Sequence, residues 1–256
     1  MPAVFVRRSA LFAALALLPS VATAQSASLP AARDLIARHV AAIGGRDAVL
    51  RHPFFRAKGN LQMPASGLNA EIEVSGAKPN LFVMKMTIPG MGEMLQGFDG
   101  THGWAMDPMQ GPRLIEGDEL VQLVDEAEFG SVLRESQNIE SVETTEKVTL
   151  GNEDCYKVRV KRKNGRESFD CYSVASGLLI GAYADQETPM GAVQSVTEFK
   201  DYRDFSGVKQ PTQIVVSVMN QQQIMTFSSY EYGAMQAGAF AVPAAISTLI
   251  SQKPKP

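Results

Sequence analysis

The sequence is short of several features, and each shortage removes a class of function. Its 256 residues carry 24 Lys and Arg against 27 Asp and Glu, so the formal net charge is only −3. A chain with this balance has no positive field to attract a phosphate backbone, which argues against sequence-independent nucleic-acid binding. No apolar run approaches the roughly 18 residues that cross a bilayer as a helix. We therefore predict a protein with no transmembrane segment and no nucleic-acid partner.

Catalytic signatures are also missing. The sequence has no H-E-x-x-H, G-x-S-x-G or G-x-x-x-x-G-K-[ST] pattern, which mark zinc proteases, serine hydrolases and P-loop nucleotide hydrolases. Gly90 and Gly92 do not form a dinucleotide-binding loop, because Leu95 stands where the third glycine would be. The three histidines are far apart in the sequence. We expect a protein that is not an enzyme and needs no cofactor and no metal.

Residues 1–24 have the three parts of an export signal. They contain a basic start at Arg7 and Arg8, an unbroken apolar run over 10–18, and a small-x-small cleavage site that ends at Ala24. The apolar run has the length of a signal-peptide core and is too short to span a bilayer. No cysteine follows the cleavage site, so no lipid anchor is expected. We predict a cleaved signal peptide and a mature protein that is free in the periplasm.

The two cysteines, Cys155 and Cys171, flank the hairpin turn signal Asn164-Gly165. An even cysteine count in an exported protein favours a disulfide between the two neighbouring strands. The alternation argues against it, because Cys155 alternates in phase with Lys157 whereas Cys171 alternates in phase with Phe169. Cross-strand partners have to share a face. The sequence therefore indicates a candidate disulfide and leaves its formation open.

The hydrophobic period changes from 3.6 to 2 residues near residue 55. Residues 30–43 have one apolar face, which predicts a helix that ends at Gly44 and Gly45. Strands are predicted over 55–63, 68–74, 81–88, 94–98, 103–107, 139–150, 155–162, 168–174, 177–185, 192–203, 211–219 and 223–230. Further helices are predicted over 116–129 and 243–250.

Most of these strands are polar on one side and apolar on the other, which is typical of an antiparallel sheet with one buried face. A sheet of about ten strands has to curl or close. No linker or internal repeat divides residues 25–256. We predict a single α+β domain, in which a long curved antiparallel sheet carries an N-terminal helix and a helical insertion in mid-sheet.

Methionine is the unusual residue of this chain. Twelve are present, and several stand beside proline or glycine in predicted turns, among them Met63, Met91, Met109 and Met190. Turns are normally polar, so flexible apolar side chains there indicate an adaptable apolar surface. The alternative is that these loops fold inward over the core.

A copper site is a second interpretation of the methionines. Soft thioether and imidazole ligands suit Cu(I), and they are supplied by the pairs Met84-x-Met86, Met91-x-x-Met94 and Met106-x-x-Met109 with His102 nearby. However, Met84 and Met86 alternate in phase with Phe82 and Ile88, as core residues do. Thioethers alone are weak support for a metal site.

A set of short motifs occurs along most of residues 25–256. They are Ala42-Ile43-Gly44-Gly45, the strand over 57–63, FDGTHGW at 98–104 with Asp107-Pro108, SGLL at 176–179, DYR at 201–203, GVKQP at 207–211 and FAVP at 240–243. With these motifs in this order, the chain resembles the LolA-like superfamily, exported carriers related to the outer-membrane lipoprotein-sorting protein.

The resemblance implies an incomplete, half-open β-barrel with helices packed into its mouth and a lipid or acyl chain bound on the concave face. The mid-chain helix would then be a lid. The matching concave positions are Phe55, Leu61, Met63, Ile72, Phe82, Met84, Met86, Met94, Trp104 and Met106, and the lid positions are Leu120, Leu123 and Val124. Trp104 is equally compatible with an ordinary core position.

We therefore expect an exported soluble carrier for a lipid, a lipoprotein acyl chain or another hydrophobic ligand. The cargo and delivery partners of the lipoprotein chaperone are not assigned to this chain, because its methionine-rich turns set it apart from that chaperone. One alternative is an envelope sensor or scaffold that contacts a protein partner through an apolar surface and has a solid core. The other alternative is the Cu(I)-binding protein considered above.

Overall fold

The computed structural model describes residues 28–188, 191–219, 221–235 and 238–252. The predicted signal peptide over 1–24, and Met190 among the turn methionines, lie outside the described residues. None of the described helices has the length and hydropathy that a membrane span needs.

The described residues form thirteen strands and a few short helices. The strands are β1 (Phe54–Met63), β2 (Leu68–Ala77), β3 (Leu81–Ile88), β4 (Gly92–Phe98), β5 (Gly103–Asp107), β6 (Gly111–Ile115), β7 (Ile139–Leu150), β8 (Glu153–Arg162), β9 (Glu167–Ser173), β10 (Leu179–Thr188), β11 (Gly191–Phe205), β12 (Val208–Val218) and β13 (Gln221–Gly233). The helices are α1 (Ala32–Ala42), α2 (Arg46–Arg51), α3 (Gly117–Ala127), the 3-10 turn η1 (Ser131–Leu133) and α4 (Ala244–Gln252).

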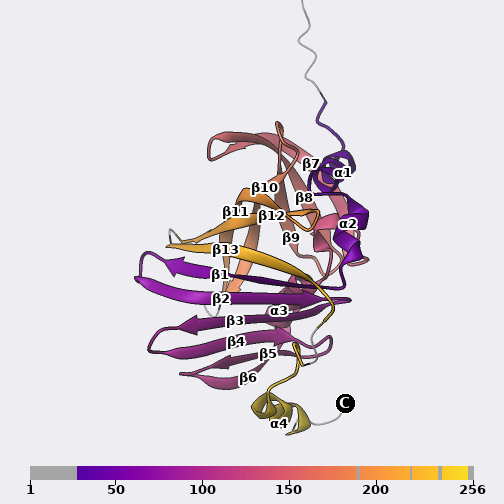
Figure 1. Ribbon diagram of the computed structural model, residues 1–256. Helices are drawn as coiled ribbons and strands as arrows, with labels where there is room; N and C mark the ends of the chain where they lie inside the picture. Colours follow the sequence, from indigo (N-terminus) through magenta and orange to yellow (C-terminus); the bar gives the residue numbers. More distant parts are fainter. Residues whose placement is uncertain (1–27, 189–190, 220, 236–237, 253–256) are drawn as a thin grey trace, which may run out of the picture.

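The thirteen strands form one sheet in the order β6-β5-β4-β3-β2-β1-β13-β12-β11-β10-β9-β8-β7, and neighbouring strands are antiparallel. β13 lies between β1 and β12 and so joins the N-terminal and C-terminal halves of the sheet. β6 and β7 are at the two ends and do not pair with each other, so the barrel stays open. Figure 1 shows β1–β6 below and β7–β12 above, with α1 and α2 beside the upper half. The predicted α+β fold with an incomplete antiparallel barrel is confirmed.

One strand was not predicted. β6 (Gly111–Ile115) is short and contains Pro112, which cannot donate a backbone hydrogen bond. Proline is nevertheless tolerated in an edge strand, which pairs on one side only, and β6 is the edge strand beside β5. A pattern search that treats proline as a strand breaker therefore misses this element.

The pairing register follows one face of the sheet from the N-terminal to the C-terminal half. Leu61 pairs with Met225, Met225 with Ile214, and Ile214 with Phe199. Phe199 packs against the apolar cluster that α1 shares with β8 to β10, which includes Leu35. We call the face that carries these residues the inner face. In the C-terminal half it is covered by α1.

Cys155 and Cys171 form a disulfide that joins β8 and β9, with their Cα atoms 5.5 Å apart. Cys155 pairs with Ser173, and Cys171 pairs with Lys157, so both cysteines are on one face. The alternation was wrongly taken as evidence against this disulfide. Phe169, like Cys171, lies on the same face of the sheet as Lys157. The Nζ of Lys157 is 4.8 Å from the centre of the Phe169 ring, and such a cation–π contact stabilises an aromatic ring on a charged face.

Candidate ligand-binding face

Half-buried methionines line one part of the inner face in the N-terminal half of the barrel. Met84, Met86, Met94 and Met225 pack around buried residues such as Ile72. In the described residues, every member of this apolar cluster belongs to a strand. We call it the methionine face and define it by Leu61, Ile72, Met84, Met86, Met94, Ile214 and Met225.

The other end of the same face is covered by α3. Leu120, Leu123 and Val124 pack with Phe82 and Phe98, and Leu123 is only 1% exposed. These are the helix residues that the sequence assigned to a lid, and the structure places all of them against the inner face. The helix therefore covers one end of the inner face. Its contacts in this cluster do not include the residues of the methionine face.

A glycine in β5 makes the close approach of α3 possible. A Cβ atom at Gly103 would lie 2.8 Å from Cδ1 of Leu120 and 3.0 Å from Cδ2 of Leu123. A side chain at this position would force the leucine side chains of α3 to shift from their places on the sheet. Gly103 belongs to the FDGTHGW motif, so this part of the motif serves helix packing.

Two arginines tie α3 to the C-terminal half of the barrel. The Asp125 carboxylate is 3.3 Å from Nε of Arg162 in β8 and 3.1 Å from Nη1 of Arg166, in the turn before β9. The Asp125 side chain is only 12% exposed, so water screens these ion pairs less than it screens surface pairs. α3 is thus anchored to the C-terminal half by these buried charges, and to the N-terminal half by apolar contacts and an exposed ion pair between Glu119 and Arg113 of β6.

A buried ion pair lies on the inner face of β9. The guanidinium of Arg134 donates to both carboxylate oxygens of Asp170, at 2.7 and 2.9 Å, and the Tyr172 hydroxyl donates to the same carboxylate at 3.0 Å. Burial lowers the pKa of Arg134, but the Asp170 charge more than offsets this and holds the pKa above its usual value. Burial and the same charge raise the pKa of Tyr172. The Arg134 guanidinium is therefore charged at neutral pH.

His39 of α1 lies next to this ion pair. Its Nδ1 accepts a hydrogen bond from the backbone N–H of Leu179 at 3.0 Å, and the residue is 1% exposed. Burial lowers the pKa of His39 to about 4, with Asp170 and Arg134 acting in opposite directions. The imidazole is therefore neutral at neutral pH and works as a hydrogen-bond acceptor that fixes α1 to β10.

The strand register shows on which face of the sheet each predicted concave residue lies. It does not show contact with a ligand. It places eight of the ten strand positions on the inner face: Phe55, Leu61, Met63, Ile72, Phe82, Met84, Met86 and Met94. Their role in binding stays a prediction.

Trp104 and Met106 are on the opposite, outer face, so their assignment to the concave face was wrong. Met106 pairs with Leu95, and Trp104 pairs with Gly97. A Cβ atom at Gly97 would lie 2.3 Å from Cζ2 of Trp104, so the indole packs directly over this glycine. Trp104 is 2% exposed and is a core residue of the outer side. β5 has apolar residues on both faces, including Ala105 between the two, so alternation could not assign its sides.

The structure brings together only part of the ligand set of the copper hypothesis, because Met84, Met86 and Met94 share one cluster whereas Met91, Met106 and Met109 lie elsewhere. Met84 packs in the apolar cluster of the inner face, whereas Met106 is on the outer face. Met91 and Met109 are 49% and 81% exposed in turns. His102 is engaged at the sheet end, where its Nδ1 is 3.3 Å from the Asp99 carboxylate. No group of three or more His, Cys, Asp or Glu side chains suited to a metal occurs in the part of the chain that the structure describes.

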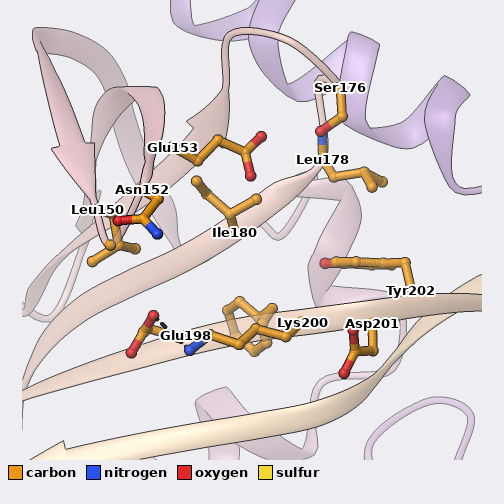
Figure 2. Close-up of a pocket in the computed structure, with 12 residues that line it drawn as sticks. Leu150, Asn152, Glu153, Ser176, Leu178, Ile180, Glu198, Lys200, Asp201 and Tyr202 are labelled. Atoms are coloured by element: carbon orange, nitrogen blue, oxygen red, sulfur yellow. Dashed lines mark hydrogen bonds and ion pairs between the residues drawn. The ribbon is translucent and has the colours of Figure 1, made fainter.

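An open cleft of about 740 Å³ lies away from the methionine face. It is bounded by the β7–β8 turn, the β9–β10 turn and β11, and Figure 2 shows Glu153 and Ser176 on one side with Glu198 and Lys200 on the other. Glu198 pairs with Lys200 at 2.9 Å, and Glu153 accepts a hydrogen bond from Ser173. The side chains of Glu153, Glu198 and Lys200 therefore have partners within the protein. None of the site residues predicted from the sequence lines this cleft.

Two of the short motifs meet beside this cleft. The Tyr202 hydroxyl, from DYR, donates to the backbone oxygen of Leu179, from SGLL, at 2.7 Å. The helix end Ala42-Ile43-Gly44-Gly45 is joined to GVKQP by a hydrogen bond from the N–H of Lys209 to the oxygen of Ile43 at 2.9 Å. These motifs form hydrogen bonds that join elements of the fold, which explains why they identify a fold and not a ligand.

No family model matches the sequence, and no curated protein matches it. Solved structures do match its fold. A LolA superfamily protein from Nitrosomonas europaea is 10% identical with a TM-score of 0.57, and the match covers 84% of this chain and 99% of that one. A DUF1329 family protein from Desulfovibrio piger is 13% identical with a TM-score of 0.59, over 84% and 97% of the two chains.

A putative outer membrane lipoprotein-sorting protein domain from Vibrio parahaemolyticus is 8% identical with a TM-score of 0.55, and the match covers 82% of this chain and 96% of that one. At such low identities the similarity is one of fold. These matches span nearly the whole of the other chains. The chain has the LolA-like fold.

Proposed function

We propose that the protein is an exported carrier that holds an acyl chain or another lipid against the methionine face and catalyses no reaction. The observation that carries the proposal is a set of half-buried apolar side chains on the inner face of an open barrel, beyond the part that α3 covers. The export pattern in residues 1–24 and the LolA-like fold support it. The lipoprotein-sorting description of the Vibrio parahaemolyticus domain is consistent with this chemistry.

The chemistry of the methionine face suits a hydrocarbon. Each methylene that leaves water gains about 0.8 kcal/mol, so a chain of several methylenes is held without any polar contact. Methionine is unbranched and flexible, so its thioethers can repack around chains of different length. A carrier also has to release its cargo, and an acyl chain that extends from the methionine face under the end covered by α3 would leave only when α3 moves.

Native mass spectrometry of the mature protein from periplasm, followed by organic extraction, tests the proposal. We expect a bound mass in the lipid range that disappears after extraction. A protein that is unliganded on purification, and stays unliganded after incubation with mixed envelope lipids, would contradict a carrier function. That outcome would favour the scaffold alternative with a solid core.

The ion pairs of Asp125 are expected to slow the release of ligand. Asp125→Asn removes the charge that holds α3 to Arg162 and Arg166, which costs about 1–2 kcal/mol of closed-state stability and speeds release about tenfold. Stopped-flow displacement of a fluorescent fatty acid measures this rate. Glu119→Gln is the matched control, because Glu119 pairs with Arg113 within the N-terminal half, at 2.6 Å. Equal release rates from both variants would refute the role of Asp125.

A further inference from the structure

Four consecutive hairpin turns lie along the part of one rim that runs from β12 to β6. The register places the β1–β2, β3–β4, β5–β6 and β12–β13 turns at the same end, because consecutive antiparallel strands reverse there. In Figure 1 these turns are on the left. The inner face at this end is the methionine face, whereas α3 packs at the other end of β3 and β4.

Exposed methionines stand in three of these turns. Met91 is 49% exposed between β3 and β4, Met109 is 81% exposed between β5 and β6, and Met219 is 68% exposed between β12 and β13. We call these residues the methionine rim. The opposite hairpin turns, over 78–80, 99–102 and 206–207, contain no methionine. Met235, which is 52% exposed, follows the end of β13 on that opposite side, but it lies outside these hairpin turns.

The backbone holds these tips outward. The Asp107 carboxylate accepts hydrogen bonds from the N–H groups of Met109 and Gln110, at 2.7 and 3.1 Å, which fixes the β5–β6 turn. Gly90 has φ +76° beside Met91, a conformation that other residues adopt only with strain. The backbone beside Met91 and Met109 is thus held in defined turn conformations.

The rim suits a fluid apolar surface better than a protein partner. Successive turns are two strands apart, which is roughly 10 Å along the rim, so the methionines are separate and do not form one compact patch. Protein interfaces concentrate their binding energy in a contiguous packed centre. Side chains that are spread along a rim can each enter the boundary between headgroups and acyl chains independently.

We propose that the methionine rim seats the protein on the surface of a lipid bilayer, with Met91, Met109 and Met219 at the level of the upper acyl chains. This adds a docking surface to the proposed carrier function and brings the methionine face next to the source or destination of a lipid. The turn segments 89–92 and 108–111 contain no charged residue. Docking should therefore depend on apolar insertion and not on anionic lipids.

Vesicle flotation tests the docking surface. We expect the mature protein to float with vesicles of phosphatidylethanolamine and phosphatidylglycerol and equally with phosphatidylcholine vesicles, at low and high salt. The triple variant Met91→Ser, Met109→Ser and Met219→Ser should lower the partition coefficient at least tenfold. Met235→Ser is the matched control, because Met235 is 52% exposed but follows the other end of β13, and it should leave flotation unchanged.

Three outcomes would overturn the docking proposal. They are no flotation of the parent protein, equal flotation of the triple variant, and binding that salt or the omission of phosphatidylglycerol abolishes. Lipid retention, followed by native mass spectrometry of the same samples, is a separate readout. Because the rim side chains are not part of the methionine face, the triple variant should still retain lipid. Failure of docking and failure of the carrier function are therefore distinguishable.

Discussion

Asp170→Asn is expected to lower the free energy of unfolding by about 3–5 kcal/mol, the largest stability effect that the structure predicts. The substitution keeps the shape of the side chain but leaves the guanidinium of Arg134 buried without its counter-charge. Asp170 is 1% exposed, so water cannot replace the lost carboxylate without opening the packing under α1. Urea unfolding followed by circular dichroism measures the loss.

A double-mutant cycle separates the ion pair from general damage. Arg134→Met also leaves an unpaired charge. The Asp170 carboxylate then still accepts a hydrogen bond from the Tyr172 hydroxyl, but it has lost the guanidinium. Arg134→Met combined with Asp170→Asn removes both charges, and we expect it to cost clearly less than the sum of the single variants. Additive losses would show that the two side chains are not coupled and would refute the interpretation.

The periodicity of the sequence predicted the sheet because one buried face imposes a strict alternation on each strand. It assigned the faces correctly where apolar residues occupied one side only, as in β2, where Ile72 alternates with Glu71 and Glu73. It failed in β5, where Trp104 and Ala105 are both apolar and the face is decided by the register with β4. Register is a property of the folded sheet, and alternation alone does not contain it.

The polar contacts between elements could not be predicted for a related reason. Arg134 and Asp170 are 36 residues apart, and His39 and Leu179 are 140 residues apart. No local sequence pattern connects residues that are so far apart in the chain, and the sequence around each residue does not indicate its partner. The grouping of exposed methionines at one rim was visible in the sequence only as methionine-rich turns. The strand order was needed to bring those turns to the same end of the barrel.

Met84→Asp is expected to abolish lipid retention, the largest functional effect that the structure predicts. Met84 lies on the inner face between Val74 of β2 and Gln96 of β4, and it packs against the apolar cluster that forms the methionine face. A carboxylate here would lose hydration whenever an acyl chain covered it, and an unpaired charge without water costs several kcal/mol or more. That cost is comparable with the gain from burying several methylenes.

The measurement compares bound lipid by native mass spectrometry in variants of equal stability. Thr226→Asp is the matched control, because Thr226 is exposed on the outer face between Asn60 and Gln213, next in the chain to Met225. It introduces the same charge and should retain lipid as the parent protein does. Met84→Leu preserves the apolar surface and should also retain lipid, which separates polarity from shape. A folded Met84→Asp protein that retains lipid at the parent level would place the ligand elsewhere, because an acyl chain cannot cover this position and leave its carboxylate hydrated.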